Sequence, residues 1–191
     1  MSEPAPRQAL QQRVAATILD GAARILVVPG EQASMNDVAA AAGVARATVY
    51  RYFPNRQALL DELAEAAVAD AESGLAAARI DEVDPEEGIA RAVRALVDVG
   101  DAFVLLARER VRSDPGRYER SITQPLRRLF ERGQAAGDIR QDVPSARLTE
   151  SLTGLIVGVL TSAQPLGKED TVATVTGLLF DGARSRGPRG I

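Results

Sequence analysis

Apolar residues recur every three or four positions along most of the chain, and the alternation of apolar and polar residues that marks a strand does not stand out. The first stripe consists of Val14, Ile18, Ala22 and Ile25, and Pro29-Gly30 marks its end. Side chains at this spacing lie on one face of an α-helix. The pattern therefore predicts an all-α fold with about nine helices and no sheet.

Two short helices are predicted next, on either side of a glycine. Ser34 precedes Met35 and is followed by an acid at Asp37, which is the spacing of a capping box and predicts a helix start at Met35. Gly43 ends this helix, and the following one stops before Pro54. The inward positions of the pair are Met35, Val38, Ala39, Ala42, Val44, Val49 and Phe53.

Six further helices are predicted after Pro54. Asp84-Pro85-Glu86-Glu87 supplies an N-cap residue, a proline for the first turn and acids for the positive end of a helix, so it indicates a helix start and not a metal site. Pro125 either begins or kinks its helix. We expect residues 185–191 to be disordered. The expected helices run over about 56–78, from 84 to the break at Gly100-Asp101, from 103 into the charged segment and turn at 108–120, from about 126 to Gly133 or Gly137, over 144–163 and over 168–183.

Histidine and cysteine are both absent from the 191 residues. The chain therefore lacks the commonest general base, the commonest transition-metal ligand, disulfides and thiolate metal sites. Acid pairs such as Glu86-Glu87 and Asp98 with Asp101 remain, but helix capping and solvation explain them. We expect no enzymatic activity, no cofactor and no bound metal.

The N-terminal end of the chain is mildly basic. Residues 1–60 hold six arginines and four acidic residues, a net charge of +2, so the remainder must carry −5 to give the overall −3. This distribution permits a local site for a polyanion. The N-terminus does not resemble a signal peptide, and the most apolar run, from Gly154 to Leu160, is too short to span a membrane. We expect a cytoplasmic protein.

Two short helices joined at Gly43 predict a helix-turn-helix, whose second helix lies in the major groove of DNA. Arginine can bind guanine bidentately, alanine and threonine methyls can meet the thymine methyl, and tyrosine hydroxyls can bind phosphate. The alternative is that the tyrosines are half-buried and the arginines only solvated; the capped helix and the glycine turn favour DNA binding. The residues expected to face outward are Arg46, Ala47, Thr48, Tyr50, Arg51 and Tyr52.

Residues 34–60, SMNDVAAAAGVARATVYRYFPNRQALL, resemble the DNA-binding signature of the TetR (tetracycline-repressor) family of transcriptional regulators. Residues 132–140, RGQAAGDIR, are similar to a stretch found late in many members. The resemblance implies an all-helical homodimer, with a helix-turn-helix DNA-binding domain over 1–55 and a ligand-binding and dimerisation domain over 56–184.

The resemblance also implies roles for single residues. Ala45 departs from the family pattern, in which a serine often caps the recognition helix, and Arg56 replaces a usual lysine. Carried over by position, Arg46, Ala47 and Thr48 fall where members touch bases, Tyr50, Tyr52 and Arg56 fall where phosphate is contacted, and Ser34 and Asn36 fall at the DNA-facing start of the second helix.

The implied partners are double-stranded operator DNA, a small-molecule effector and a second copy of the chain. The helix over 144–163 is apolar over a wide arc, and Gly154 and Gly158 would permit close approach of a partner helix unless they pack within the subunit. Candidates for the effector pocket are Phe103, Leu106, Arg110, Tyr118, Leu126 and Phe130. Candidates for the dimer interface are Leu152, Gly154, Leu155, Gly158, Val159, Val175, Leu178 and Leu179.

The sequence therefore predicts a ligand-responsive DNA-binding regulator. Its simplest form is a repressor that binds a palindromic operator as a dimer and is released by an apolar or amphipathic effector. The alternative is a helical small-molecule-binding dimer that has no affinity for DNA. A salt-dependent gel shift with DNA distinguishes the two.

Overall fold

The computed structural model describes residues 6–26, 33–109, 115–164 and 166–184. Apart from one bridge between Ile139 and Arg184, its regular structure is helical. Helix α7, a π-helical turn over Glu119–Thr123 and α8 follow one another without a break, so the described chain holds nine separate α-helical rods, as predicted. The helices are α1 (Pro6–Leu26), α2 (Met35–Ala42), α3 (Arg46–Tyr52), α4 (Arg56–Ala77), α5 (Pro85–Val99), α6 (Asp101–Glu109), α7 (Pro115–Tyr118), α8 (Gln124–Ala136), α9 (Ser145–Leu160) and α10 (Lys168–Ala183).

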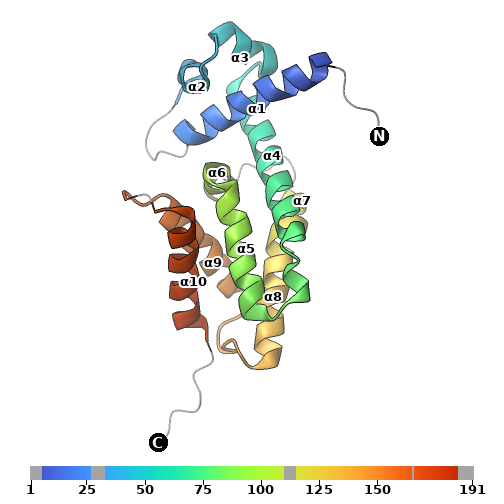
Figure 1. Cartoon of the computed structure of the whole chain (residues 1–191), viewed down its shortest axis with the longest axis vertical. Helices are drawn as coiled ribbons and strands as arrows, with labels where there is room; N and C mark the ends of the chain where they lie inside the picture. The colour runs from blue at the N-terminus through green and yellow to red at the C-terminus, as the bar shows by residue number, and fades with distance from the viewer. Residues whose placement is uncertain (1–5, 27–32, 110–114, 165, 185–191) are drawn as a thin grey trace, which may run out of the picture.

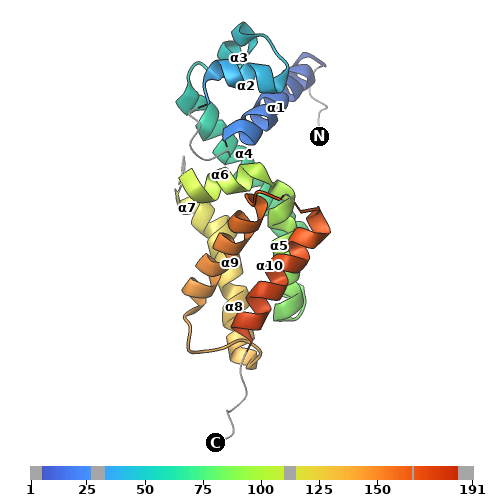
Figure 2. The ribbon, with the colours of Figure 1, turned by 90° about the vertical axis from the view of Figure 1, so that its left-hand side faces the viewer.

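The molecule is elongated, with α1–α3 at one end and α4 running from them into a bundle of the later helices (Figure 1). We call α1–α3 with the first two turns of α4 the head, and the rest the body. Each has its own hydrophobic cluster. Helix α6 lies across the top of the body, beneath the head (Figure 2). Its Leu105 is buried in the head cluster, whereas Phe103 and Leu106 are buried in the body cluster.

Two helix starts form as their capping signals predict. The Ser34 hydroxyl accepts a hydrogen bond from the Asp37 backbone at 3.3 Å, and the Asp37 carboxylate accepts one from the Ser34 backbone at 2.8 Å. The side chain of Asp84 likewise accepts a hydrogen bond from the Glu87 backbone at 3.0 Å, with Pro85 in the first turn of α5. Both interactions satisfy N–H groups that a helix leaves without an internal partner.

The rod from α7 to α8 corrects one prediction and resolves another. The charged segment 108–120 was expected to end in a turn, but its described part from Pro115 onward is helical. Pro125 does not begin its helix, because helical structure precedes it. Just before the proline, the Gln124 backbone donates to Glu119, five residues back, which is the π-helical pattern. This wider turn accommodates a ring that would press on a regular preceding turn.

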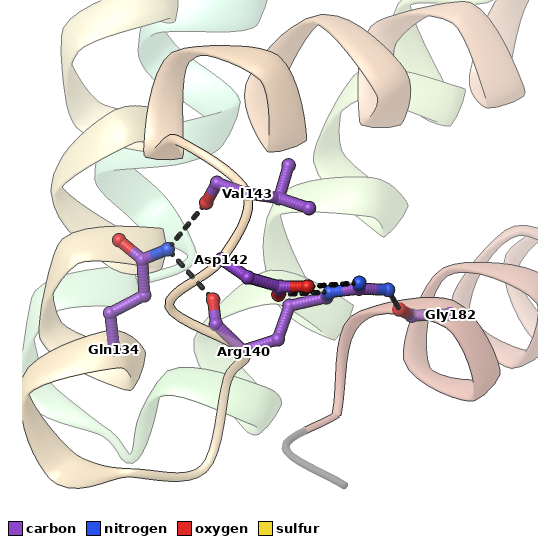
Figure 3. Close-up of polar contacts among 5 residues, drawn as sticks. All are labelled: Gln134, Arg140, Asp142, Val143 and Gly182. Atoms are coloured by element: carbon purple, nitrogen blue, oxygen red, sulfur yellow. Dashed lines mark hydrogen bonds and ion pairs between the residues drawn. The ribbon is translucent and has the colours of Figure 1, made fainter.

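The segment between α8 and α9 fastens the end of α10 (Figure 3). The Gln134 amide donates to the carbonyls of Arg140 and Val143, both at 2.8 Å. The Arg140 guanidinium forms two hydrogen bonds of 2.6 Å to Asp142 and one of 3.0 Å to the carbonyl of Gly182. These contacts fix the start of α9 against the end of α10.

The apolar run from Gly154 to Leu160 lies inside α9, which is 16 residues long. In the part of the chain that the structure describes, no helix combines the length and apolar character needed to cross a membrane. The expected stop at Pro29-Gly30 and the expected disorder of residues 185–191 fall outside the described residues.

Candidate nucleic-acid interface

The turn between α2 and α3 is set by one glycine. Gly43 has φ 67° and ψ 29°, a left-handed conformation in which a side chain is unfavourable. Its N–H donates to Ala40 at 3.1 Å, and the N–H of Val44 donates to Ala39 at 3.0 Å, which together form a Schellman motif. Helix α3 therefore leaves α2 at an angle fixed by backbone hydrogen bonds.

The outer face of α3 is polar and accessible. Arg46, Ala47 and Tyr50 are exposed, and Thr48 beside them is half-buried. The Arg46 guanidinium carbon lies 5.2 Å from the centroid of the Tyr50 ring, a cation–π distance. The opposite face is held by Val49, which is fully buried in the head cluster. One short helix thus presents a guanidinium, a methyl and a phenol on one surface.

The last turn of α3 differs from the prediction. Tyr52 was expected to face outward, but it is half-buried against the head cluster, with its ring centroid 6.4 Å from that of Phe53. The exposed Arg51 stacks over Tyr52 at 5.3 Å. Both residues line a hollow closed by Leu10 and other residues of α1. They therefore lie on the α1 side of the helix, away from Arg46 and Tyr50.

The remaining predicted residues flank α3. Arg56 is exposed at the first position of α4, whose N-cap Asn55 accepts a hydrogen bond from the Ala58 backbone. Asn36 is exposed on the first turn of α2, whereas the Ser34 hydroxyl is occupied by its capping box. As its residue type predicted, Ala45 gives α3 no side-chain cap.

The charge on this surface is positive. Among the residues that the structure describes, none of Arg46, Arg51 and Arg56 forms a salt bridge to a carboxylate. The one acid nearby on α2 is engaged, because hydrogen bonds from Ser34 hold the pKa of Asp37 below its usual value. Three guanidiniums without a salt bridge to a described carboxylate, all at one end of the molecule, suit a polyanion.

The predicted effector residues do not line an open cavity together. Phe103, Leu126 and Phe130 are buried in the body cluster, and Leu106 borders a void of about 10 Å³. Tyr118 is half-buried against the same cluster. The sixth candidate, Arg110, lies outside the described residues.

A larger pocket, of about 860 Å³, lies between the head and the body. Its walls come from α1, α4, α5 and α6, so it has no continuous sequence signature and was not predicted. Charged side chains line it, among them Arg24 of α1 and Asp101 of α6. Burial raises the pKa of the Asp101 carboxyl, and the charge of Arg24 partly opposes this rise.

The predicted dimer residues divide into two sets. Leu152, Val175 and Leu179 are buried in the core of their own protomer, so they do not present surface to a partner, and their inclusion is corrected here. Leu155 and Val159 are half-buried. The accessible members are Gly154, Gly158 and Leu178, of which Leu178 is 57% exposed. Among the described residues, a Cβ placed on either glycine would meet no atom within 4 Å beyond its chain neighbours and its own helix backbone, so neither glycine packs against another described helix of the subunit.

Of the acidic residues considered for catalysis, Glu86, Glu87 and Asp98 form salt bridges. Glu86 pairs with Arg184, whose hydrogen bond lowers the pKa of Glu86, and Asp98 pairs with Lys168. In the described ranges, no group of three or more acidic side chains is placed to hold a metal ion.

Comparison with known proteins agrees with this geometry. Residues 18–63, which cover most of the head, match the model of the family described as bacterial regulatory proteins, tetR family. A relative from Mycolicibacterium smegmatis (strain ATCC 700084 / mc(2)155), the HTH-type transcriptional repressor LfrR, is 37% identical over 105 residues. That match covers 52% of each protein, so it spans about half the length of this curated relative.

Solved structures extend the likeness over the body. The TetR-like regulator LfrR from Mycobacterium smegmatis in complex with proflavine is 24% identical, with a TM-score of 0.66 over 89% of this chain and 96% of its own. AibR in complex with isovaleryl coenzyme A and operator DNA is 22% identical, with a TM-score of 0.67 over 87% and 98%. At these identities the likeness establishes the fold. The likeness to the tetR family model is limited to the head, over residues 18–63, and the likeness of the body to these solved structures is one of fold.

Proposed function

We propose that this protein is a ligand-responsive transcriptional repressor that binds a palindromic operator as a homodimer. The observation that carries the proposal is the exposed face of α3, where Arg46, Ala47 and Tyr50 lie together on a helix fixed by the Gly43 turn. The named relative is a repressor, and one structural neighbour was solved with operator DNA. A second copy would supply a second recognition helix, which suits an inverted repeat.

Each residue of the face has an expected role. Arg46, at the leading end of α3, reads a base edge, because a guanidinium can bind guanine bidentately. The hydroxyl of Tyr50 and the guanidinium of Arg56 bind phosphates and hold the helix in register. Arg51 and Tyr52 lie toward α1. We expect any contact that they make with the duplex to be with its phosphate backbone and not with a base edge. The DNA-binding unit of this proposal is residues 1–55, and residues 56–184 form the ligand-binding and dimerisation unit.

The body would bind the effector and the partner. The two neighbours were solved with organic ligands, proflavine and isovaleryl coenzyme A, and we infer an apolar or amphipathic organic effector here as well. A ligand that shifts α4 would change the spacing of the two heads and lower operator affinity, for which a coupling of about 1–3 kcal/mol is enough. The partner would pack on the exposed part of α9 and α10, around Gly154, Gly158 and Leu178.

The test is operator selection from random DNA, followed by binding measurements over a salt series. Arg46→Ala should weaken the selected operator by about 1–3 kcal/mol and mismatched DNA much less, so base preference relaxes. Tyr50→Phe and Arg56→Ala should weaken all sequences alike, and Arg56→Ala should lower the salt slope by about one unit per site. Arg128→Ala, which removes an exposed arginine of α8 in the body, is the matched control and should change nothing.

Two results would contradict the proposal. If Arg46→Ala and Arg128→Ala behave alike, α3 does not read the DNA. If the wild-type chain selects no sequence and shows no salt-dependent binding, it is a ligand-binding dimer without DNA affinity.

A further inference from the structure

Helices α1 and α2 touch through their backbones. A Cβ placed on Gly21 would lie 2.8 Å from the Ala42 nitrogen and 2.9 Å from its Cα. One turn further along α1, the Arg24 guanidinium donates a hydrogen bond of 3.0 Å to the carbonyl of Ala41. A movement of this part of α1 must therefore move the end of α2, and with it the turn that sets α3.

Arg24 fills a gap that the turn leaves open. The Schellman motif at Gly43 satisfies the carbonyls of Ala39 and Ala40 but not that of Ala41, which also lacks a partner within α2. The guanidinium supplies that partner and places positive charge at the negative end of the helix. The position of the recognition helix thus depends on a side chain from α1.

The other side of Arg24 faces the body. Arg24 and Asp101 line the same pocket between head and body, and the positive charge of Arg24 acts on the Asp101 carboxyl. Asp101 is the first residue of α6, the helix that also inserts Leu105 into the head cluster. Within the described part of the chain, Asp101 has no salt bridge. An acceptor for the guanidinium is therefore available at the top of the body.

We propose that Arg24 is a positioning residue with two alternative acceptors, the Ala41 carbonyl in the head and the Asp101 carboxylate at the start of α6. With Arg24 on Ala41, as in this structure, the turn before α3 is held in the geometry described above. A shift of α6 toward α1 draws the guanidinium to Asp101 and leaves Ala41 without its partner. The inference rests on the proposed DNA-binding function and names one residue through which the body acts on the head.

Other charged groups face the same pocket, from α1, α4 and α5. Three of them are already paired: Arg91 with Glu87, Arg94 with Glu169, and Asp98 with Lys168. The remaining acids are Asp20 and Asp70. Neither acid lies on α6, so an attraction between either acid and Arg24 would not change when α6 moves.

The experiment is a double-mutant cycle on the selected operator. Arg24→Met keeps most of the side-chain length but donates no hydrogen bond, and should lower operator affinity about 3- to 10-fold. Arg24→Lys, which keeps the charge and a donor, should recover part of the loss. Asp101→Asn should raise affinity about 2- to 5-fold, because the competing acceptor is weakened. In the Arg24→Met background Asp101→Asn should have no effect.

Controls separate this mechanism from simple charge and from failure of the proposed function. Asp20→Asn removes an equal charge from the same pocket and should not reproduce the effect of Asp101→Asn. An equal gain from Asp101→Asn with and without Arg24, or no loss in Arg24→Met, would overturn the inference. The rate of hydrogen exchange at the Gly43 and Val44 amides tests the role of Arg24 without DNA. Arg24→Met should raise this rate and Asp101→Asn should lower it. If the wild type binds no DNA but exchange follows this pattern, only the proposed function fails.

Discussion

Adding one methyl group at Gly21 should destabilise the head, although alanine is the better helix former. The new Cβ would lie 2.8 Å from the Ala42 nitrogen, whereas ordinary contact begins at 3.4 Å, so α1 and α2 must separate by about 0.6 Å. Overpacking of this kind costs about 1–3 kcal/mol, and stretching the bond from Arg24 to Ala41 costs about 1 kcal/mol more. Replacing glycine by alanine in a helix returns about 1 kcal/mol.

The balance is a loss of about 2 kcal/mol, which lowers the melting temperature of a chain of this size by about 4–8 °C. Thermal and urea denaturation followed by circular dichroism measure it. The control is Ala16→Gly at an exposed position of the same helix, which reports helix propensity alone and should cost about 1 kcal/mol. If Gly21→Ala instead stabilises the protein by about that amount, the two backbones are not in contact and the reasoning is wrong.

Two further predictions concern the dimer face and the cap of α2. Gly158→Ala should improve the propensity of α9 yet raise the dimer dissociation constant in sedimentation, because the glycine is exposed on the proposed interface; unchanged dimerisation would place the interface elsewhere. Ser34→Ala should destabilise the protein by about 1 kcal/mol near neutral pH. Folding lowers the pKa of the Asp37 carboxyl. The ionised carboxylate therefore contributes to the free energy of unfolding above the ordinary pKa of aspartate, and this contribution is lost as pH falls through the lowered pKa. The free energy of unfolding of the Ser34→Ala variant should therefore change less between neutral and acidic pH than that of the wild type. Denaturation at a series of pH values measures both.

Features that are decided within a few residues could be predicted from the sequence. The starts of α2 and α5 depend on caps and first-turn residues three positions apart, and both lie where Ser34 and Asp84 indicated. The end of α2 at Gly43 was also predictable, because it depends only on the left-handed backbone conformation of that one residue. The face of α3 was largely predictable for the same reason, since Val49 fixes which side is buried.

Features that depend on several helices could not be predicted. Tyr52 has the same chemistry as Tyr50, but it packs against the head cluster and faces α1, which makes it half-buried. Leu152 belongs to an apolar stripe that continues around α9, and the sequence does not say which part faces the subunit's own core. The pocket containing Arg24 and Asp101 is assembled where α1 meets α4, α5 and α6, which follow much later in the chain.

Helix α6 is the place where the two hydrophobic clusters meet. Leu105 is buried with the head while Phe103 and Leu106 are buried with the body, so adjacent side chains of one helix belong to different cores. Well-packed cores resist continuous deformation, so α6 cannot move within the body without disturbing the head. Helix α4, the other element shared by both, is held to α7 by Arg117, whose guanidinium bonds to Glu65 and Glu72 at 2.6 and 3.2 Å. These ties hold α4 against the body, whereas α6 inserts Leu105 into the head cluster and carries Asp101 in the pocket that Arg24 also lines, so we expect a change in the body to reach the helix-turn-helix through α6 as well as through α4.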